Sequence, residues 1–269
     1  MDILETIIEN KRLEVERQKV AVPLDMLINL GSRMMSRNVV SMRDALEQSS
    51  SGIIAEFKRR SPSKGWLNQN VKVADVVPSY EHGGASACSI LTDGSFFGGS
   101  FADLKNARSL VTLPLLRKDF IIDEYQLYQA RVMGADAVLL IAACLSEKEC
   151  RHLAKIAHLS DMEVLLEVHN ENELSYMNEN IDMLGVNNRN LGTFHTDIEN
   201  SFRLAKCIKK EIGEGSDTPL LISESGINSA KVINELREVG FRGFLMGETF
   251  MKTGDPGTAL AAFISELKF

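Results

Sequence analysis

The stretch Ile53-Ile-Ala-Glu-Phe-Lys-Arg-Arg-Ser-Pro-Ser-Lys-Gly65 joins a short apolar run to a loop in which basic residues and serines surround a proline. An uninterrupted apolar run is typical of a strand that is buried on both faces, as in a parallel sheet. A doubly wound open sheet usually carries a Gly-x-Gly-x-x-Gly turn after its first strand, and this loop departs from that pattern. The stretch therefore favours a closed barrel over an open sheet.

Short apolar runs of the same kind recur along the chain, each followed by a polar or glycine-rich turn and a helical pattern. This alternation requires right-handed crossovers and a parallel sheet. We predict a (β/α)8 TIM barrel that occupies residues 1–269 as a single domain, with residues 1–51 as an N-terminal helical extension. The predicted strands are 53–57, 88–91, 113–116, 137–141, 164–166, 183–186, 220–222 and 243–246.

The N-terminal segment has the pattern of an amphipathic helix. Ile3, Ile7 and Ile8 recur at helical spacing, and Pro23 ends the pattern. Acidic residues precede the basic ones and the apolar residues are interrupted, so the segment lacks the order of a secretory signal. We expect a helix that packs on the rest of the protein.

The composition limits the classes of function. The 269 residues are 44% hydrophobic and 25% charged, with a formal net charge of -7, which argues against a nucleic-acid-binding face. No apolar run approaches the roughly 18 residues of a membrane span. The cysteines do not fall at zinc-binding spacing, so we expect reduced thiols in a cytoplasmic protein without a bound metal. They are Cys88, Cys144, Cys150 and Cys207.

The active site of a TIM barrel lies at the carboxyl ends of its strands, and most of the predicted strand ends carry an ionisable or amide side chain. Lysines and glutamates that meet in a partly dry cavity hold one another ionised and can exchange protons. We interpret the set as a general acid–base site, and a buried structural ion-pair network is the alternative. This interpretation rests on Lys58, Lys118, Glu56 and Glu167, and the polar strand ends further include Asn187, Arg189, Glu224 and Glu248.

The segments after the seventh and eighth predicted strands favour phosphate binding. Ser225, Gly226 and Gly247 are small residues at the places where such barrels bind phosphate on backbone N–H groups and a helix N-terminus. Lys58 and Ser61 would supply further donors across the mouth. For the Ser-Gly pair on its own, an ordinary turn is the alternative.

Aromatic residues also gather near the predicted rim. Phe57, Phe96, Phe97 and Phe120 lie at or just beyond strand ends. Core packing explains most aromatic residues, but several rings around one mouth indicate a planar or aromatic group on the substrate. Trp66 and the histidines form no constellation, and we expect them to be surface or packing residues.

Together these residues resemble the indole-3-glycerol-phosphate synthase family of tryptophan biosynthesis. The resemblance covers essentially the whole chain, and the N-terminal helix is similar to the extension of that family. It rests on Ile54-Ala-Glu-Phe-Lys-Arg-Arg-Ser-Pro-Ser-Lys-Gly65, Leu116-Arg-Lys-Asp-Phe120, Glu167, Gly185-Val-Asn-Asn-Arg-Asn-Leu191, Ser223-Glu-Ser-Gly-Ile227 and Met246-Gly-Glu248.

The resemblance implies a lyase that closes the ring of 1-(2-carboxyphenylamino)-1-deoxyribulose 5-phosphate, with loss of carbon dioxide and water, to give indole-3-glycerol phosphate. It implies no cofactor. It assigns Lys118 as general acid on the ribulose carbonyl and Glu167 as base in the dehydration. Lys58 is implied to bind the anthranilate carboxylate, and which lysine donates a proton at which step stays open.

The resemblance divides the remaining matched residues into three groups. Residues that orient the substrate or the acid–base groups are Glu56, Asn187, Arg189, Glu224 and Ser225. Residues at the phosphate end are Ser61, Gly226, Gly247 and Glu248. Residues of the apolar pocket for the anthranilate ring are Phe97, Phe120 and Leu139.

Two positions depart from the family pattern. Gly98 stands where many relatives have a longer polar residue, and Asn190 stands where aspartate is common. We expect altered loop mobility and substrate contacts near Gly98, and one altered supporting contact near Asn190.

Two rival functions stay open. Phosphoribosylanthranilate isomerase is a phosphate-binding barrel of the same pathway, but it requires a catalytic Cys/Asp pair and usually lacks the N-terminal extension. A non-catalytic barrel that binds a phosphorylated metabolite is the other, and the joint presence of Lys118 and Glu167 argues against it. We expect a monofunctional chain, because it ends after the eighth helical segment, and association with other enzymes of the pathway stays open.

Overall fold

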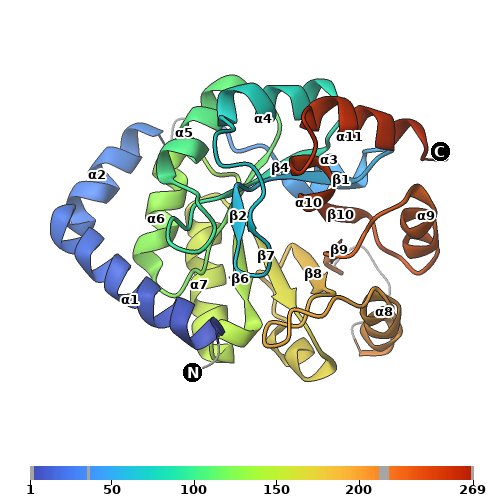
Figure 1. Cartoon of the computed structure of the whole chain (residues 1–269). Helices are drawn as coiled ribbons and strands as arrows, with labels where there is room; N and C mark the ends of the chain where they lie inside the picture. Colours follow the sequence, from blue (N-terminus) through green and yellow to red (C-terminus); the bar gives the residue numbers. More distant parts are fainter. Residues whose placement is uncertain (1–2, 35–36, 212–217, 268–269) are drawn as a thin grey trace.

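The computed structural model describes residues 3–34, 37–211 and 218–267. In these residues eight parallel strands close into a barrel in the order β1-β10-β9-β8-β7-β6-β5-β4 (Figure 1). The predicted (β/α)8 TIM barrel is confirmed. The barrel strands are β1 (Ile53–Phe57), β4 (Ala87–Leu91), β5 (Leu115–Lys118), β6 (Ala137–Ile141), β7 (Glu163–Val168), β8 (Met183–Asn187), β9 (Leu220–Glu224) and β10 (Gly243–Met246).

Helices cover the outside of the barrel, and a short antiparallel hairpin of β2 (Arg60–Ser61) and β3 (Gly65–Trp66) lies in the loop after β1. Within the described ranges no helix is long and apolar enough to cross a membrane. The helices are α1 (Ile3–Ala21), α2 (Leu24–Met34), α3 (Met42–Glu47), α4 (Val73–His82), α5 (Phe101–Leu110), α6 (Glu124–Met133), η1 (Ala142–Cys144), α7 (Glu147–Leu159), η2 (Glu171–Tyr176), α8 (Glu199–Glu211), α9 (Ala230–Glu238), α10 (Glu248–Met251) and α11 (Pro256–Ser265).

Several strands extend further toward their carboxyl ends than predicted. Glu167 and Glu224 belong to β7 and β9 themselves, because an inward-facing charged side chain does not interrupt the backbone hydrogen bonds of a strand. β5 begins at Leu115 rather than at residue 113, because Pro114 has no N–H to donate to the ladder. Predicting strands from apolar runs alone is wrong at these ends.

Side chains from alternate strands fill the barrel interior in layers. An apolar layer comes from β1, β5, β7 and β9, and a charged layer lies two residues further along the same strands. Because side chains alternate with a period of two, both layers point into the barrel. The apolar layer consists of Ile54, Leu116, Leu165 and Ile222, and the charged layer consists of Glu56, Lys118, Glu167 and Glu224.

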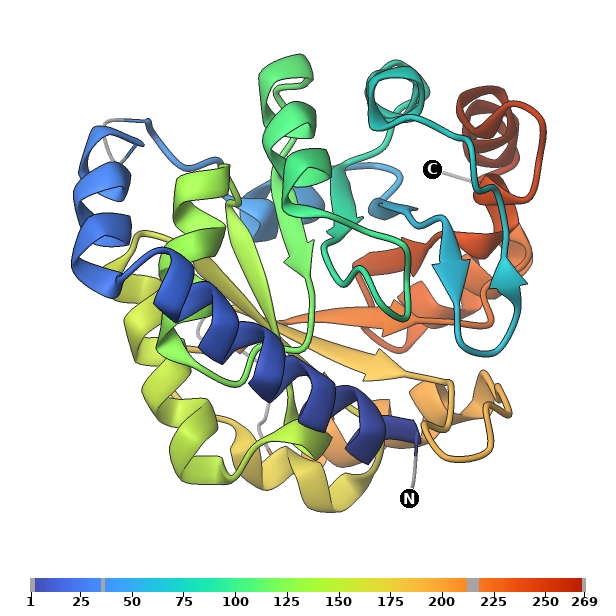
Figure 2. The same ribbon diagram turned by 60° about the vertical axis from the view of Figure 1, so that its left-hand side comes forward.

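The predicted N-terminal helix is present as α1, which crosses in front of the barrel while α2 lies beside α6 (Figure 2). Lys11 holds it in place. Its side chain is 1% exposed, and its Nζ lies 3.0 Å from Asp93 Oδ2 and 2.9 Å from Asp119 Oδ1. Burial opposes the lysine charge, but the carboxylates of Asp119 and Asp93 outweigh it and raise the pKa of Lys11. Since these carboxylates follow β5 and β4, this ion cluster joins α1 to the mouth of the barrel.

The opposite end of the barrel is held by Asp136, which is fully buried. Its Oδ1 accepts hydrogen bonds from Arg37 Nη1 at 2.8 Å and from the Val40 N–H at 3.0 Å. Its Oδ2 accepts from Arg108 Nη1 at 2.7 Å and from the Leu115 N–H at 2.8 Å. Asp136 therefore ties the segment between α2 and α3 to α5 and β5.

We expect Asp136→Asn to lower the free energy of unfolding by about 3 kcal/mol, because two guanidinium groups lose a buried anion. Urea denaturation followed by circular dichroism measures this. The control Arg151→Ala breaks an exposed pair with Glu179 and should cost less than about 1 kcal/mol. Equal losses in the two variants would contradict the role given to Asp136.

Candidate active site

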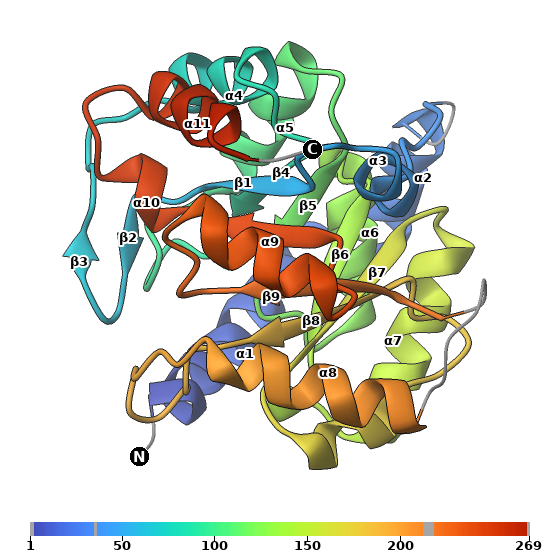
Figure 3. The ribbon, with the colours of Figure 1, turned by 90° about the vertical axis from the view of Figure 1, so that its right-hand side faces the viewer.

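A cavity of about 520 Å³ opens at the carboxyl ends of the strands, and all eight barrel strands contribute to its lining. Figure 3 places the β2–β3 hairpin, α10 and the start of α1 at this end of the barrel and α3 at the other. Every site residue predicted from the sequence lines this cavity. These residues are Glu56, Lys58, Ser61, Phe97, Lys118, Phe120, Leu139, Glu167, Asn187, Arg189, Glu224, Ser225, Gly226, Gly247 and Glu248.

Lys118 is the centre of the charged layer. Its Nζ lies 3.1 Å from Glu167 Oε2 and 3.1 Å from Glu224 Oε2. Asn187 Nδ2 donates to the other oxygen of Glu167 at 3.0 Å. Both carboxylates are nearly inaccessible, so the surrounding water screens these interactions weakly. The lysine is therefore held between two acids that belong to different strands.

The protonation states of this cluster differ from those of free side chains. Burial opposes the charge of Lys118, but Glu167 and Glu224 outweigh it and raise the pKa of the lysine. Burial likewise opposes the Glu167 carboxylate, and Lys118 outweighs it and lowers the pKa of Glu167. Burial, with Glu167 adding to it, raises the pKa of Glu224 to about 7. Lys118 and Glu167 are thus ionised at neutral pH, and Glu224 titrates there.

A second ion pair lies at the end of β1. Lys58 Nζ is 2.5 Å from Glu56 Oε1, and the lysine side chain is 18% exposed while the glutamate is 4% exposed. The carboxylate thus sits in the wall, and the lysine reaches into the mouth. This is the arrangement that an anion-binding lysine needs.

Two glycines make room for the buried carboxylates. A Cβ on Gly185 would lie 2.3 Å from Glu224 Oε1, and a Cβ on Gly247 would lie 2.5 Å from Glu56 Oε1. No side chain fits there without moving the charged layer. The resemblance gives roles to Asn187 and Arg189 in the motif that begins at Gly185. The packing role of Gly185 itself is visible only in three dimensions.

The turn after β9 has an unusual backbone. Ser225 and Gly226 have φ values of 66° and 78°, and serine rarely adopts this left-handed region. Asn188 Nδ2 supports the turn by donating to the carbonyl oxygens of Glu224 and Ser225 at 3.0 Å each. α9 begins later, at Ala230, so the small residues form a turn before the helix and not its first turn.

Arg189 connects three loops around the mouth. Its Nη1 donates to Ser63 Oγ at 2.6 Å, and its Nη2 lies 3.6 Å from Glu248 Oε2. Ser63 belongs to the loop after β1, and Glu248 opens α10. Sequence reasoning did not select Ser63, although it lies inside the first motif.

The side of the cavity formed by β6 and by the loops after β4 and β5 carries an apolar surface. The rings of Phe97 and Phe120 have centroids 5.9 Å apart, and Leu139 extends the surface. α1 closes this side of the cavity. The amphipathic pattern of α1 identifies its apolar face, but the pattern could not predict which part of the protein this face covers. The contributing residues of α1 are Ile3, Leu4 and Ile7.

Two of the phenylalanines expected at the mouth do not line the cavity. Phe57 stands between Glu56 and Lys58, so strand alternation turns it outward into the main hydrophobic core, where it is 1% exposed. Phe96 packs against the apolar cluster inside the barrel. The expectation of a ring at the mouth is wrong for both.

The two departures from the family pattern have local explanations. Gly98 has φ 66°, and a Cβ there would lie 2.9 Å from the Trp66 ring, so this tryptophan excludes a longer residue. Asn190 Oδ1 accepts hydrogen bonds from the Gly192 and Thr193 N–H groups at 3.0 and 2.9 Å. An aspartate oxygen could accept the same bonds, so Asn190 retains this turn.

One of the histidines, which the sequence led us to expect on the surface or in packing, lies beside the charged layer. His169 Nε2 lies 3.3 Å from Glu167 Oε1, and the side chain is 12% exposed. A signal was present in the sequence, because a residue two positions after Glu167 at a strand end shares its face.

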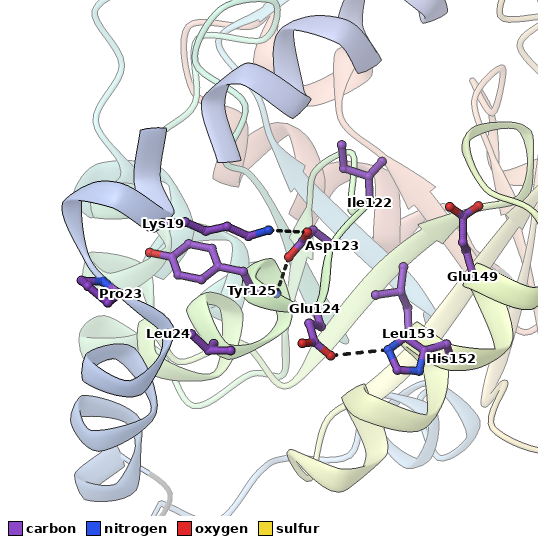
Figure 4. Close-up of a pocket in the computed structure, with 10 residues that line it drawn as sticks. All are labelled: Lys19, Pro23, Leu24, Ile122, Asp123, Glu124, Tyr125, Glu149, His152 and Leu153. Atoms are coloured by element: carbon purple, nitrogen blue, oxygen red, sulfur yellow. Dashed lines mark hydrogen bonds and ion pairs between the residues drawn. The ribbon is translucent and has the colours of Figure 1, made fainter. Parts of the chain in front are cut away.

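A second cavity, of about 490 Å³, lies between α1, α6 and α7 (Figure 4). The ionisable groups that line it already have partners, and Glu149 Oε2 accepts a hydrogen bond from the Ser146 backbone N–H at 2.7 Å. Lys19 Nζ lies 2.7 Å from Asp123 Oδ2, and His152 Nε2 lies 3.4 Å from Glu124 Oε2. None of the predicted site residues lines it, so the mouth of the barrel is the candidate active site.

Comparison with solved structures supports the fold. The crystal structure of 3-hexulose-6-phosphate synthase matches with a TM-score of 0.57 over 81% of this chain and 100% of that one, at 10% identity. KGPDC from Streptococcus mutans matches with a TM-score of 0.58 over 80% of this chain and 95% of that one, at 14% identity. At such identities the likeness concerns the barrel alone.

Comparison of sequences identifies the family. The model of the family described as indole-3-glycerol phosphate synthase matches residues 4–263. The indole-3-glycerol phosphate synthase of Bacteroides thetaiotaomicron is 55% identical over 99% of both chains. That of Polaromonas naphthalenivorans is 42% identical over 98% of this chain and 99% of its own. The predicted resemblance is confirmed, and the chain belongs to the indole-3-glycerol phosphate synthase family.

Proposed function

We propose that the charged layer at the barrel mouth closes the indole ring, with Lys118 as general acid and Glu167 as base. As a member of its family, the chain is a carboxy-lyase of tryptophan biosynthesis that forms indole-3-glycerol phosphate. The observation that carries the residue assignment is Lys118 Nζ at 3.1 Å from both Glu167 and Glu224 inside the cavity. A positioned acid and a positioned base are thereby available without rearrangement.

The substrate has an aromatic ring at one end and a phosphate at the other, and the cavity is divided in the same way. Phe97, Phe120 and Leu139 suit the anthranilate ring on the side of β4, β5 and β6. The small residues after β9 and β10, together with Ser61, suit the phosphate on the other side. The reacting carbons then lie over the charged layer between the two ends.

In the proposed reaction, a ring carbon of the anthranilate attacks the ribulose carbonyl carbon while Lys118 donates a proton to the carbonyl oxygen. Loss of carbon dioxide returns the bonding electrons to the ring. The hydroxyl group then takes a proton from one of the two lysines and leaves as water, and Glu167 accepts the proton that the substrate carbon releases as the double bond forms. Charge develops on nitrogen and oxygen in turn, and the fixed charges of the mouth can stabilise it.

Lys58 is proposed to bind the anthranilate carboxylate before that group is lost. Glu56 Oε1 lies 2.5 Å from Lys58 Nζ and positions the lysine, whose side chain is 18% exposed at the mouth. Arg189 and Asn187 are proposed to orient the substrate and Glu167, and Glu248 to support the phosphate end through Arg189. We place the reaction in the cytoplasm, in keeping with four free cysteines.

The rival isomerase is disfavoured by the lining of the cavity. It would need a cysteine at the mouth, and in the described part of the chain no cysteine lines the cavity. The deciding assay incubates the purified protein with 1-(2-carboxyphenylamino)-1-deoxyribulose 5-phosphate and follows indole fluorescence. Tight binding without an increase in fluorescence would instead indicate a non-catalytic barrel.

Lys118→Ala should lower kcat by more than about 100-fold, because it removes a positioned proton donor and the counter-charge of two acids. The fluorescence assay at saturating substrate measures the change. The matched control Lys105→Ala alters an exposed lysine on α5 and should keep normal turnover. Near-normal turnover in Lys118→Ala would remove this residue from the proposed role.

Gly226→Ala should raise KM by about tenfold or more with a smaller change in kcat. The phosphate group does not react, so weaker phosphate binding affects the bound substrate and the transition state equally. The added Cβ would lie 2.8 Å from Thr196 Cγ2, and φ is 78°. Steady-state kinetics separate the two constants. Gly254→Ala is the control, since a Cβ there meets nothing within 4 Å. A fall in kcat at unchanged KM would contradict phosphate binding at this turn.

Glu224→Gln should increase stability at alkaline pH while lowering kcat. The carboxyl has its ordinary pKa of 4.5 in the unfolded chain and about 7 in the folded protein, so wild-type stability falls as pH rises through this window. Glutamine does not titrate, and we expect a gain of about 1 to 3 kcal/mol at pH 8 that vanishes below pH 4.5. Urea denaturation across pH tests this. The exposed Glu235→Gln should show no such pH dependence, and a pH-independent difference for Glu224→Gln would refute the shift.

A further inference from the structure

His169 is the first residue after β7 and lies behind the proposed base. It is two positions beyond Glu167, and its side chain faces the same side of the sheet. The Nε2 atom is 3.3 Å from Glu167 Oε1. Its side chain is 12% exposed and contributes nothing to the cavity lining, so it acts on the site only through the glutamate.

The other side of the imidazole ring faces a second carboxylate. His169 Nδ1 lies 3.4 Å from Glu173 Oε2. Glu173 is itself held in place by two hydrogen bonds. Its Oε2 accepts from the backbone N–H of His169 at 2.6 Å, and its Oε1 accepts from Asn170 Nδ2 at 2.7 Å. The imidazole therefore stands between two carboxylates whose positions are set by separate hydrogen bonds.

The two oxygens of Glu167 have different neighbours. Oε1 faces His169 and accepts from Asn187 Nδ2 at 3.0 Å. Oε2 faces Lys118 Nζ at 3.1 Å. One oxygen is thus turned to the wall and the other to the reacting centre, which is the orientation that a base needs.

The charges around His169 favour a cation. Its two ring nitrogens face the carboxylates of Glu167 and Glu173, which belong to β7 and η2. Burial opposes a charged ring, but Glu167 and Glu173 outweigh it and raise the pKa of His169 to about 10. The Cys144 thiol interacts with Glu167 and Glu173, and the Tyr176 phenol interacts with Glu173. Burial raises the pKa values of both, so both are neutral.

We infer that His169 is a positioning residue for the reaction proposed above: as an imidazolium braced by Glu173, it anchors Oε1 of Glu167 and leaves Oε2 directed at Lys118 and the substrate. The inference rests on the proposed role of Glu167 as base. A histidine that only packs against the wall would contact the same atoms without changing the titration of Glu167.

The protonation state can be tested without turnover. Nitrogen-15 NMR of the imidazole groups, assigned by the loss of one signal in His169→Gln, should show His169 protonated on both nitrogens at pH 8, where free histidine is neutral. In Glu167→Gln the pKa of His169 should fall, because one of its two anionic partners is removed. A neutral His169 at pH 8 in wild type would overturn the inference, whatever the enzyme turns over.

The kinetic test uses the pH dependence of kcat. Removing the imidazolium raises the pKa of Glu167. When both forms are compared in the Glu224→Gln background, where Glu224 no longer titrates, the acid limb of His169→Phe should therefore move upward by about 1 pH unit. We also expect kcat at pH 7 to fall by about tenfold or more, with KM within about twofold of wild type. His169→Gln keeps a hydrogen-bond donor but carries no charge. Its kcat should therefore be higher than that of His169→Phe, and its acid limb should be shifted as in His169→Phe.

His152→Gln is the matched control, because it changes a histidine that is 59% exposed on α7 and remote from the mouth. It should leave the acid limb and kcat unchanged. An unshifted acid limb in a folded His169→Phe variant would overturn the inference and leave the proposed function standing. Absence of indole formation by wild type would instead refute the proposed function, and the NMR experiment would still report the charge of His169.

Discussion

The burial of opposite charges as one layer of the barrel is the constraint on which the rest of the structure depends. In most barrels of this kind the interior layers are apolar. Here the last layer holds three carboxylates, and each has a lysine partner: Glu167 and Glu224 contact Lys118, and Glu56 contacts Lys58. Gly185 in β8 and Gly247 just after β10 leave space for the carboxylates of Glu224 and Glu56, because a side chain at either position would collide with them. The cluster is costly to bury, but it provides acid and base in fixed positions.

The two ends of the barrel use buried charge for different purposes. At the carboxyl end the pairs retain exposed edges toward a cavity, so their protons are accessible to a substrate. At the other end Asp136 is fully buried, and donors from three segments satisfy its oxygens. This favours stability and leaves the carboxylate inaccessible to a substrate. The N-terminal segment contacts both ends, through Lys11 at the mouth and Arg37 at the base. It therefore holds the barrel together as well as closing the apolar side of the cavity.

Much of the fold could be predicted because continuous apolar runs alternate with helical patterns. The barrel, the N-terminal helix and the strand ends that carry the site followed from this periodicity. The strand limits did not, because Glu167 and Glu224 lie inside strands and their charge ends the apolar run early. Phe57 was placed at the mouth because it lies at a strand end, although strand alternation puts it on the face opposite to Glu56 and Lys58.

The sequence by itself determined the eightfold β/α alternation, the charged residues at the strand ends and the family, because these depend on residue type and order. Tertiary structure decided which of those residues meet. Lys118, Glu167 and Glu224 are separated along the chain and come into contact only because alternate strands of a closed barrel point their side chains at one axis. The cover that α1 gives the mouth likewise depends on the distance between elements, which no local pattern encodes.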